Sequence, residues 1–229
     1  MLRHIGIILD GNRRWAKERN KPSLYGHKAG AKNLKELAFY IFKEKKAKIL
    51  SVFAFSTENF KRSEEEVSYL QKLLLKMLKT ELDEIKKLGV KIVISGRKEN
   101  LSNKTIEAIA KTEKETKDNK EGIFNICLNY GGCQEIVDAS KKIASLFKEN
   151  KIDLKNLNEE NFYKYLYNDL GPIDLLIRTS GEERISNFML YNLAYSEFYF
   201  TPLYFPDFNI DEFNNALLEF DKRKRRFGK

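Results

Sequence analysis

The hydrophobic positions of the chain follow two alternating patterns. Short, nearly continuous apolar runs recur five times, as expected for strands that are buried on both faces of a parallel sheet. These runs are Ile5–Leu9, Ile49–Phe55, Val90–Ile94, Ile123–Leu128 and Leu175–Ile177. Between and after them, helical spacing of apolar residues covers Ala29–Phe42, Glu64–Leu88, Asn103–Thr116, Gln134–Phe147 and Asp211–Arg225. The alternation predicts an α/β fold with a mostly parallel sheet flanked by helices.

The segment Glu64–Leu88 is the longest of the predicted helices. Ser63 followed by Glu66 is the pattern of a capping box, which fixes the first turn of a helix. Leu73 and Leu75 widen the apolar stripe beyond a single face. A wide stripe is more often ordinary core. The alternative is that part of it lines an apolar cavity for a long hydrocarbon.

Length and composition fit one large α/β domain that spans residues 1–229 without an obvious linker. Hydrophobic residues make up 42% and charged residues 33%, as in soluble globular proteins. No uncharged run approaches the roughly 18 residues of a membrane span, and the first strand leaves no room for a signal peptide. Cys127 and Cys133 show neither metal-ligand spacing nor a disulfide framework. We therefore expect a protein of the reducing cytoplasm.

The chain carries 42 Lys and Arg against 33 Asp and Glu, a formal net charge of +9. Such an excess favours anionic partners, which include nucleic acid, phosphorylated metabolites and acidic membrane surfaces. Much of the charge lies in lysine-rich helical segments, where solvated helix surface explains most of it. No RNP, helix-turn-helix or similar pattern is present, so nucleic acid is not the predicted partner.

Polar residues follow the predicted strands at the ends where α/β sheets bind ligands. The first strand runs into Asp10-Gly11-Asn12-Arg13-Arg14-Trp15. Gly11 permits close approach of the backbone to a ligand. A helix that starts after Gly11 favours binding of an anion at its N-terminus. The guanidinium groups of the two arginines are suited to bind phosphate oxygens. The carboxylate of Asp10 fits among them if it holds Mg²⁺ against a phosphate. Alternatively, Asp10 only caps a helix.

Two further loops add to this group of polar residues. The second loop, FAFSTENFKRS, offers hydroxyl, carboxylate, amide and guanidinium groups. In the segment LLIRTSGEERISNF, two arginines flank Gly181. No G-x-x-x-x-G-K-[ST] or G-x-G-x-x-G loop is present. Together, five arginines could neutralise more charge than one monophosphate carries, which predicts one or two diphosphates as ligands: Arg13, Arg14, Arg62, Arg178 and Arg184.

Five segments closely resemble the conserved blocks of cis-prenyltransferases, and within that family the chain is most similar to bacterial undecaprenyl diphosphate synthases. The segments are HIGIILDGNRRWA, GHKAGA, FAFSTENFKRS, NICLNYGG and IRTSGEERISNFMLYNLAYSEFYF. The resemblance implies Mg²⁺-dependent cis addition of isopentenyl diphosphate to farnesyl diphosphate. The implied product is undecaprenyl diphosphate, the lipid carrier precursor for cell-wall polysaccharide synthesis. The resemblance further implies a homodimer, a six-stranded sheet, an apolar tunnel, and transient contact with the inner face of the membrane when the lipid leaves.

The resemblance also assigns roles to individual residues. It implies Asp10 and Asn59 as catalytic residues, and Asp10 and Glu197 as metal ligands. Asn59 matches the family's proposed proton acceptor, but a neutral amide is a poor base, so we expect it to orient the proton toward a diphosphate oxygen. The implied substrate-binding residues are Gly11, Asn12, Arg13, Arg14, Trp15, Ser23, His27, Ser56, Thr57, Glu58, Phe60, Arg62, Arg178, Arg184, Ile185 and Ser186. The final Arg226-Phe227-Gly228 resembles a motif that reaches the partner subunit's site in relatives.

Three positions depart from the common pattern of the family. Ser23 stands where arginine is frequent, Glu183 where a bacterial relative has histidine, and Phe60 where tryptophan is commoner. Two alternatives to the undecaprenyl product are a cis-prenyltransferase of a different product length and a non-catalytic subunit of a prenyltransferase complex. Non-catalytic relatives lose the strand-end Asp, the Asn of the second loop or the arginines. This chain keeps all of them, which disfavours the second alternative.

Overall fold

In the computed structural model, which describes residues 2–61 and 63–224, six strands form one sheet in the order β3-β4-β2-β1-β5-β6. Every neighbouring pair is parallel. The α/β fold with a six-stranded sheet is therefore confirmed. The strands are β1 (His4–Ile8), β2 (Ile49–Ser56), β3 (Val90–Ser95), β4 (Gly122–Tyr130), β5 (Leu175–Arg178) and β6 (Glu197–Phe200).

Burial explains why five of these strands were predictable from hydrophobic spacing. All residues of β1 and β5 are buried, and in β4 only Ile123 is partly exposed, so their sequences are continuous apolar runs. β6 is different, because it is a four-residue edge strand in which no residue is fully buried. Hydrophobic spacing alone does not predict such a strand.

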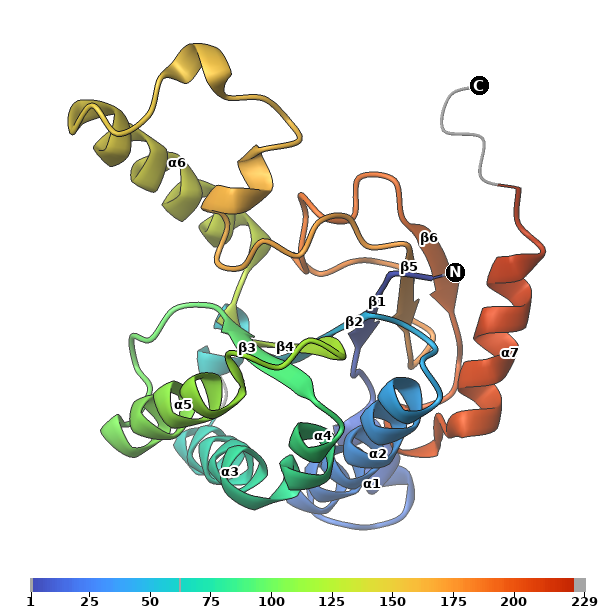
Figure 1. Ribbon diagram of the computed structural model, residues 1–229. Coiled ribbons are helices and arrows are strands. Elements are labelled where there is room, and N and C mark those ends of the chain that lie inside the picture. The colour runs from blue at the N-terminus through green and yellow to red at the C-terminus, as the bar shows by residue number, and fades with distance from the viewer. Residues whose placement is uncertain (1, 62, 225–229) are drawn as a thin grey trace.

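Seven α-helices accompany the sheet within the described residues. Figure 1 shows α1 to α5 on one side of the sheet, α7 beside β6, and α6 projecting away from the body. No helix in residues 2–61 and 63–224 is long and apolar enough to cross a bilayer. The helices are α1 (Asn12–Glu18), α2 (Ser23–Lys43), α3 (Glu64–Lys76), α4 (Asp83–Lys87), α5 (Asn103–Thr116), α6 (Gly132–Lys148) and α7 (Ile210–Asp221).

The long helix predicted over Glu64–Leu88 is divided. A π-helical turn, Met77–Glu81, follows α3, and α4 begins after Leu82. The predicted cap is present, because Ser63 Oγ accepts a hydrogen bond from the backbone N–H of Glu66 at 3.4 Å. The helical spacing of leucines continues across the break, since Leu82 is buried like the residues of α3 that face the core. Periodicity therefore identified the segment but not its interruption.

Two glycines of α2 set its distance from α1. A Cβ on Gly26 would lie 1.9 Å from the backbone oxygen of Asn12, and a Cβ on Gly30 would lie 2.2 Å from Asn12 Oδ1. Any larger residue would therefore push the two helices apart. The GHKAGA segment thus holds the start of α1 tightly against α2, beside the first polar loop.

Candidate active site

Three polar loops leave the sheet at the same edge. Ile8, the last residue of β1, pairs with Phe53 of β2 on one side and with Arg178 of β5 on the other. The loops that follow these strands therefore start side by side, as predicted from the sequence. An open cleft beside the first loop is lined by Leu9, Asp10, Gly11, Asn12, Arg13, Arg14, Lys17, Asn20, Lys21, Pro22, Ser23 and His27.

Asp10 is held between two arginines at this cleft. Its Oδ2 accepts a hydrogen bond from Arg178 Nη2 at 2.9 Å, and its Oδ1 lies 3.5 Å from Arg14 Nη2. Oδ1 also accepts the backbone N–H of Gly11 at 2.7 Å. Gly11 is the N-cap residue of α1 and no side chain caps that helix, so the alternative role of Asp10 as a helix cap does not hold. The carboxylate keeps an exposed fraction of 31% and can still reach a ligand.

The buried Arg178 connects the loop after β5 to Asp10. Its Nη1 donates to Ser186 Oγ at 2.7 Å and to the backbone oxygen of Arg184. The loop bends sharply here, with φ of 46° at Ser186 and 63° at Asn187. Non-glycine residues adopt such backbone conformations only where surrounding contacts hold them, and these residues cluster at functional sites. Ile185 packs beside this bend against the apolar cluster that contains Phe188.

Glu182 links Arg14 of the first loop to Arg184 of the loop after β5. Its Oε1 lies 3.0 Å from Arg14 Nη1, and its Oε2 accepts a hydrogen bond from Arg184. One carboxylate thus spaces the guanidinium groups of the first loop and of the loop after β5. The sequence analysis missed Glu182, although its place between Arg178 and Arg184 in one short loop was a usable signal.

A second carboxylate that the sequence analysis did not assign to the site is Glu66, in the first turn of α3. Its Oε1 lies 3.0 Å from His27 Nε2 and 3.8 Å from Arg13 Nε. The exposed fractions of His27 and Glu66 are both 8%. Glu66 therefore joins α3 to α1 and α2 at the cleft. Its place in the capping box already explained a glutamate at this position, which concealed the second role.

The second loop forms the wall on the side of β2. Asn59 Oδ1 accepts the backbone N–H of Ser56 at 3.0 Å. Partial burial acts to raise the pKa of Glu58, but hydrogen bonds from its own backbone and from Ser56 outweigh burial and lower that pKa. Thr57 and Phe60 line a neighbouring cleft. The predicted residue Arg62 and the terminal Arg226-Phe227-Gly228 lie outside the described residues.

Trp15 is not placed in the cleft, although it was predicted there. Its Nε1 donates to Asp207 Oδ1 at 2.7 Å, and its ring stacks on Tyr25 with centroids 5.8 Å apart. Because α1 begins at Asn12, Arg14 and Trp15 point in different directions from the helix. Trp15 therefore fastens α1 to α2 and to the segment before α7.

The predicted metal ligand Glu197 is far from Asp10 within one chain. Glu197 is the first residue of β6 and pairs with Leu175, the first residue of β5. Asp10 follows the last residue of β1. Glu197 therefore lies where the parallel strands begin, and Asp10 lies where they end. Glu197 Oε2 instead accepts a hydrogen bond from Arg223 Nη1 at 3.0 Å. The structure therefore does not bring Glu197 to Asp10 within one chain, and the assignment of Glu197 as a metal ligand stays a prediction.

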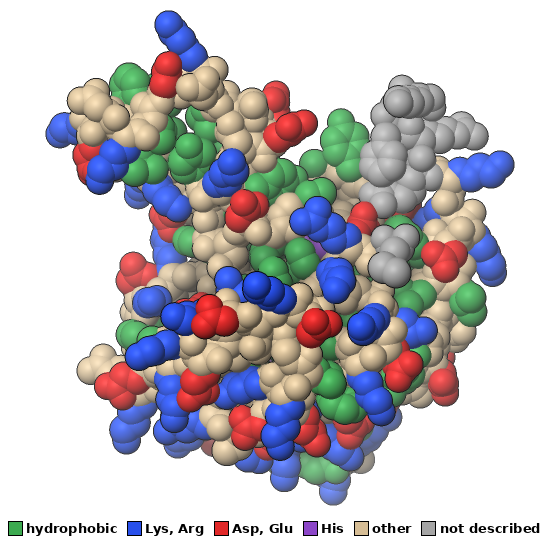
Figure 2. Space-filling model, in the orientation of Figure 1, with side chains coloured by type: hydrophobic (Ala, Val, Ile, Leu, Met, Phe, Trp, Pro, Cys, Tyr) green, Lys and Arg blue, Asp and Glu red, His purple; other side chains and the backbone are tan. Residues whose placement is uncertain are grey.

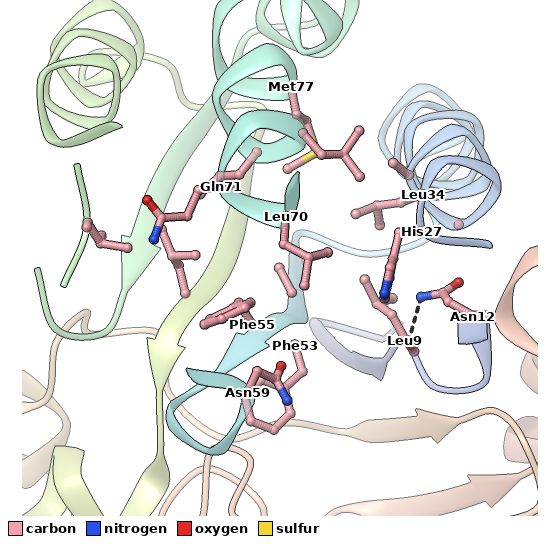
Figure 3. Close-up of a pocket in the computed structure, with 17 residues that line it drawn as sticks. Leu9, Asn12, His27, Leu34, Phe53, Phe55, Asn59, Leu70, Gln71 and Met77 are labelled. Carbon is pink, nitrogen blue, oxygen red and sulfur yellow. Dashed lines mark hydrogen bonds between the residues drawn. The ribbon is translucent and has the colours of Figure 1, made fainter. Parts of the chain in front are cut away.

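An apolar pocket of about 150 Å³ adjoins the cleft and lies between α2 and α3. Figure 3 shows Leu34 of α2, Leu70 of α3 and Met77 of the π-helical turn around it, with His27, Asn12 and Asn59 at its polar end. The alternative that part of the α3 stripe lines a cavity is thus confirmed. The apolar lining consists of Leu9, Ala31, Leu34, Phe53, Ala54, Phe55, Leu70, Leu73, Leu74, Met77, Leu101 and Leu128.

The donors at the cleft fit a magnesium ion that is shared with a substrate. Across residues 2–61 and 63–224, no three His, Cys, Asp or Glu side chains gather closely enough to hold a metal. Mg²⁺ is commonly bound by one or two carboxylates and completed by water and substrate phosphates. Asp10 supplies one exposed carboxylate beside arginines suited to phosphate, so the residues present are compatible with this mode.

Comparison with known proteins agrees with this geometry. The model of the undecaprenyl diphosphate synthase family matches residues 8–228. An isoprenyl transferase of Fusobacterium nucleatum is 47% identical over 99% of this chain and 95% of its own. A tritrans,polycis-undecaprenyl-diphosphate synthase of Pyrococcus furiosus, named as geranylgeranyl-diphosphate specific, is 45% identical over 99% of this chain and 87% of its own.

A solved structure extends the similarity to the whole fold. Lavandulyl diphosphate synthase from Lavandula x intermedia, in complex with dimethylallyl diphosphate, has a TM-score of 0.94 and 33% identity over 100% of this chain and 98% of that one. The parallel sheet with its arginine-lined cleft and adjoining apolar pocket is thus the fold of a prenyl transferase of the cis type. The chain belongs to the undecaprenyl diphosphate synthase family, and the resemblance in its five sequence blocks is confirmed.

Proposed function

We propose that the protein extends farnesyl diphosphate by successive cis additions of isopentenyl diphosphate and releases undecaprenyl diphosphate. One observation carries the proposal: the polar cleft and the apolar pocket adjoin, because Leu9, Asn12 and His27 line both. A prenyl diphosphate has a charged head and a hydrocarbon tail. The head fits among the arginines while the tail enters the pocket between α2 and α3.

The head of the allylic substrate is bound by the residues at the start of α1 and α2. The first backbone N–H groups of α1 have no partner within the helix, and Arg13, Arg14 and His27 supply charged or polar donors to diphosphate oxygens. Ser23 and Asn12 line the same cleft. Asp10 is the residue that would hold Mg²⁺, and the ion, when bound, supplies counter-charge to the departing diphosphate.

Isopentenyl diphosphate binds on the other side of Asp10. Arg178, Arg184 and Ser186 belong to the loop after β5, and the bond from Arg178 to Asp10 brings their site next to the allylic head. Asn59 lies at the mouth of the pocket, where it orients the proton that is lost in each condensation toward a diphosphate oxygen. Both substrates thus meet at the C-terminal edge of β1.

The exposed apolar side chains support a homodimer. Val137 and Phe147 of α6 have exposed fractions of 48% and 50%, and Leu154, in the segment that follows, has 44%. Figure 2 shows hydrophobic side chains gathered on this projecting part. Exposed apolar groups of this kind mark interaction sites in soluble proteins. A cytoplasmic dimer that touches the inner face of the membrane only while it releases its product fits these features.

The test is to incubate the purified protein with Mg²⁺, labelled isopentenyl diphosphate and either farnesyl or geranylgeranyl diphosphate, and to measure product lengths by mass spectrometry. We expect the farnesyl primer to be used preferentially and undecaprenyl diphosphate to dominate. Preference for the longer primer would assign this chain the specificity named for the Pyrococcus relative. No extension of either primer, with an Asp10→Asn variant as the matched inactive control, would contradict the proposal.

A further inference from the structure

The segment NICLNYGG supplies none of the residues that bind the two diphosphates in the proposed function. Its last two residues are Gly131, the N-cap residue of α6, and Gly132, the first residue of that helix. A Cβ on Gly131 would lie 2.7 Å from Asn187 Nδ2, and a Cβ on Gly132 would lie 3.1 Å from the backbone oxygen of Asn187. The paired glycines therefore make room for Asn187, a residue of the loop after β5.

Asn187 caps α6 from a distant part of the chain. The N-cap residue Gly131 provides no side-chain hydrogen bond. Instead, the backbone N–H of Gly132 donates to the backbone oxygen of Asn187 at 2.7 Å, and the N–H of Cys133 donates to Asn187 Oδ1 at 2.8 Å. The first N–H groups of a helix need acceptors from outside it. Two hydrogen bonds from α6 thus fix both the place and the orientation of Asn187.

The place of Asn187 bears directly on the isopentenyl diphosphate site. Asn187 follows Ser186, whose Oγ accepts a hydrogen bond from Arg178 Nη1 at 2.7 Å. Both residues have a left-handed backbone, with φ of 46° at Ser186 and 63° at Asn187. Such conformations persist only where the surroundings hold them. The two bonds to α6 therefore stabilise the bend that aims Ser186 at Arg178.

The amide nitrogen of Asn187 approaches the second loop. Nδ2 donates to Gln134 Oε1 at 3.2 Å, and Gln134 lines one cleft together with Thr57 and Phe60. Burial acts to raise the pKa of the Glu58 carboxyl, and a hydrogen bond from the Asn187 side chain is among the contacts that more than offset this effect. One amide group thus bonds to α6 through its oxygen and reaches the second loop through its nitrogen.

The geometry makes Asn187 a link between two loops that approach the substrates from different strands. We propose that Asn187 is a positioning residue, which holds Ser186 of the isopentenyl diphosphate site and Glu58 of the second loop in fixed places relative to each other. Asn187 acts through these two residues and does not touch the substrate. The inference rests on the proposed function, because the site that it orders is the one proposed for isopentenyl diphosphate.

Removing the side chain of Asn187 tests the link to the isopentenyl diphosphate site. Asn187→Gly removes the side chain alone, because glycine adopts a φ of 63° without strain and the bond from Gly132 goes to the backbone. KM for isopentenyl diphosphate should rise about 5- to 10-fold. KM for the allylic primer should stay within about twofold of the parent value. The matched controls are Asn150→Gly and Asn150→Asp, because Asn150 is exposed at the other end of α6 and has a φ of 54°.

Asn187→Asp separates the two arms of the link. The new carboxylate still accepts the N–H of Cys133, but it cannot donate to Glu58 and it repels that carboxylate. We therefore expect kcat to fall at least about fivefold, with a smaller rise in KM for isopentenyl diphosphate than in Asn187→Gly. Asn187→Asp should also impair a Glu58→Gln protein less than it impairs the parent, because the glutamine amide can donate to the new carboxylate.

Hydrogen exchange, followed by NMR on the protein without substrates, measures the link independently of turnover. Asn187→Gly should speed exchange of the Cys133 amide at least about tenfold, whereas the Gly132 amide should stay protected by its bond to the backbone oxygen. In Asn187→Asp both amides should stay protected. Exchange of the Ser56 amide, which bonds to Asn59 in the second loop, should become faster in both variants.

The outcomes distinguish this inference from the proposed function. If the parent protein extends no primer, the proposed function is contradicted, and the exchange measurement then decides the role of Asn187 alone. The inference is overturned if the Cys133 amide exchanges in Asn187→Gly as slowly as in Asn150→Gly. In an active parent, an equal rise of both KM values would show a merely structural residue and overturn it. Equal impairment by Asn187→Asp with and without Glu58→Gln would overturn the link to the second loop.

Discussion

Replacing Glu66 with glutamine tests whether this carboxylate positions the groups that bind the allylic head. The substitution keeps the helix cap, because Ser63 bonds to the backbone N–H of residue 66. It removes the negative charge that faces His27 at 3.0 Å and Arg13 at 3.8 Å. His27 and Arg13 then lose the group that fixes their orientation toward the cleft.

The expected magnitude follows from the exposure of the two partners. His27 is buried, and a hydrogen bond to a charged group is worth about 1.5–3 kcal/mol, of which an amide retains part. The Arg13 side chain has an exposed fraction of 56%, so solvent screening limits its pair to less than about 1 kcal/mol. A net loss of about 1–2 kcal/mol corresponds to a roughly 5- to 30-fold higher KM for the allylic primer.

Steady-state kinetics with each substrate varied in turn measures this effect. KM for isopentenyl diphosphate should change by less than about twofold, because Arg178 and Arg184 do not contact Glu66. Glu65→Gln is the matched control, since Glu65 is the exposed neighbour in the same helical turn. The reasoning is refuted if both KM values rise together, or if the melting temperature falls while the primer KM stays at the control value.

Three further predictions concern the cleft and the sheet. Asp10→Ala should lower kcat by at least about 100- to 1000-fold with an unchanged circular dichroism spectrum; near-normal turnover would overturn its assignment. Arg184→Ala should raise KM for isopentenyl diphosphate more than KM for the primer. Arg178→Ala should do the same and should also lower kcat, because it releases Asp10. A selective rise in the primer KM would mean that the two diphosphate sites are reversed. Burial lowers the pKa of His4 to about 4 from the 6.5 of an unfolded chain, so the unfolded state binds the proton first. The free energy of unfolding from urea titrations should be highest above pH 6.5 and should fall by about 3 kcal/mol toward pH 4. A His4→Gln variant whose free energy of unfolding falls equally with pH would exclude protonation of His4 as the cause.

Strands with buried apolar runs and helices with clear spacing could be predicted from the sequence because packing against both faces of the sheet dictates their composition. α5 begins and ends where periodicity predicts, at Asn103 and Thr116. β6 has no such run. A sixth strand was expected only because the family resemblance implies a six-stranded sheet. The π turn after Lys76 was also beyond prediction, since leucine spacing tolerates one extra residue.

The residues of the site fall into the same two groups, those that the sequence located and those that it did not. Strand-end position located Asp10 and Arg178, because parallel strands deliver their following loops to one edge. The position of Glu197 depended on the register of β6, which no local pattern specifies. Glu66 pairs with His27 and Arg13, and Glu182 pairs with Arg14 as well as with the neighbouring Arg184. The pairings between distant segments emerge only when the helices and loops are assembled.

The close contact between α1 and α2 constrains one wall of the apolar pocket but not the other. Asn12 lies against Gly26 and Gly30, so α2 cannot shift without disturbing the diphosphate cleft. The opposite wall of the pocket, on α3, is not bound by that contact. Substitutions on α3 can therefore reshape the pocket while the diphosphate cleft at the strand ends stays in place.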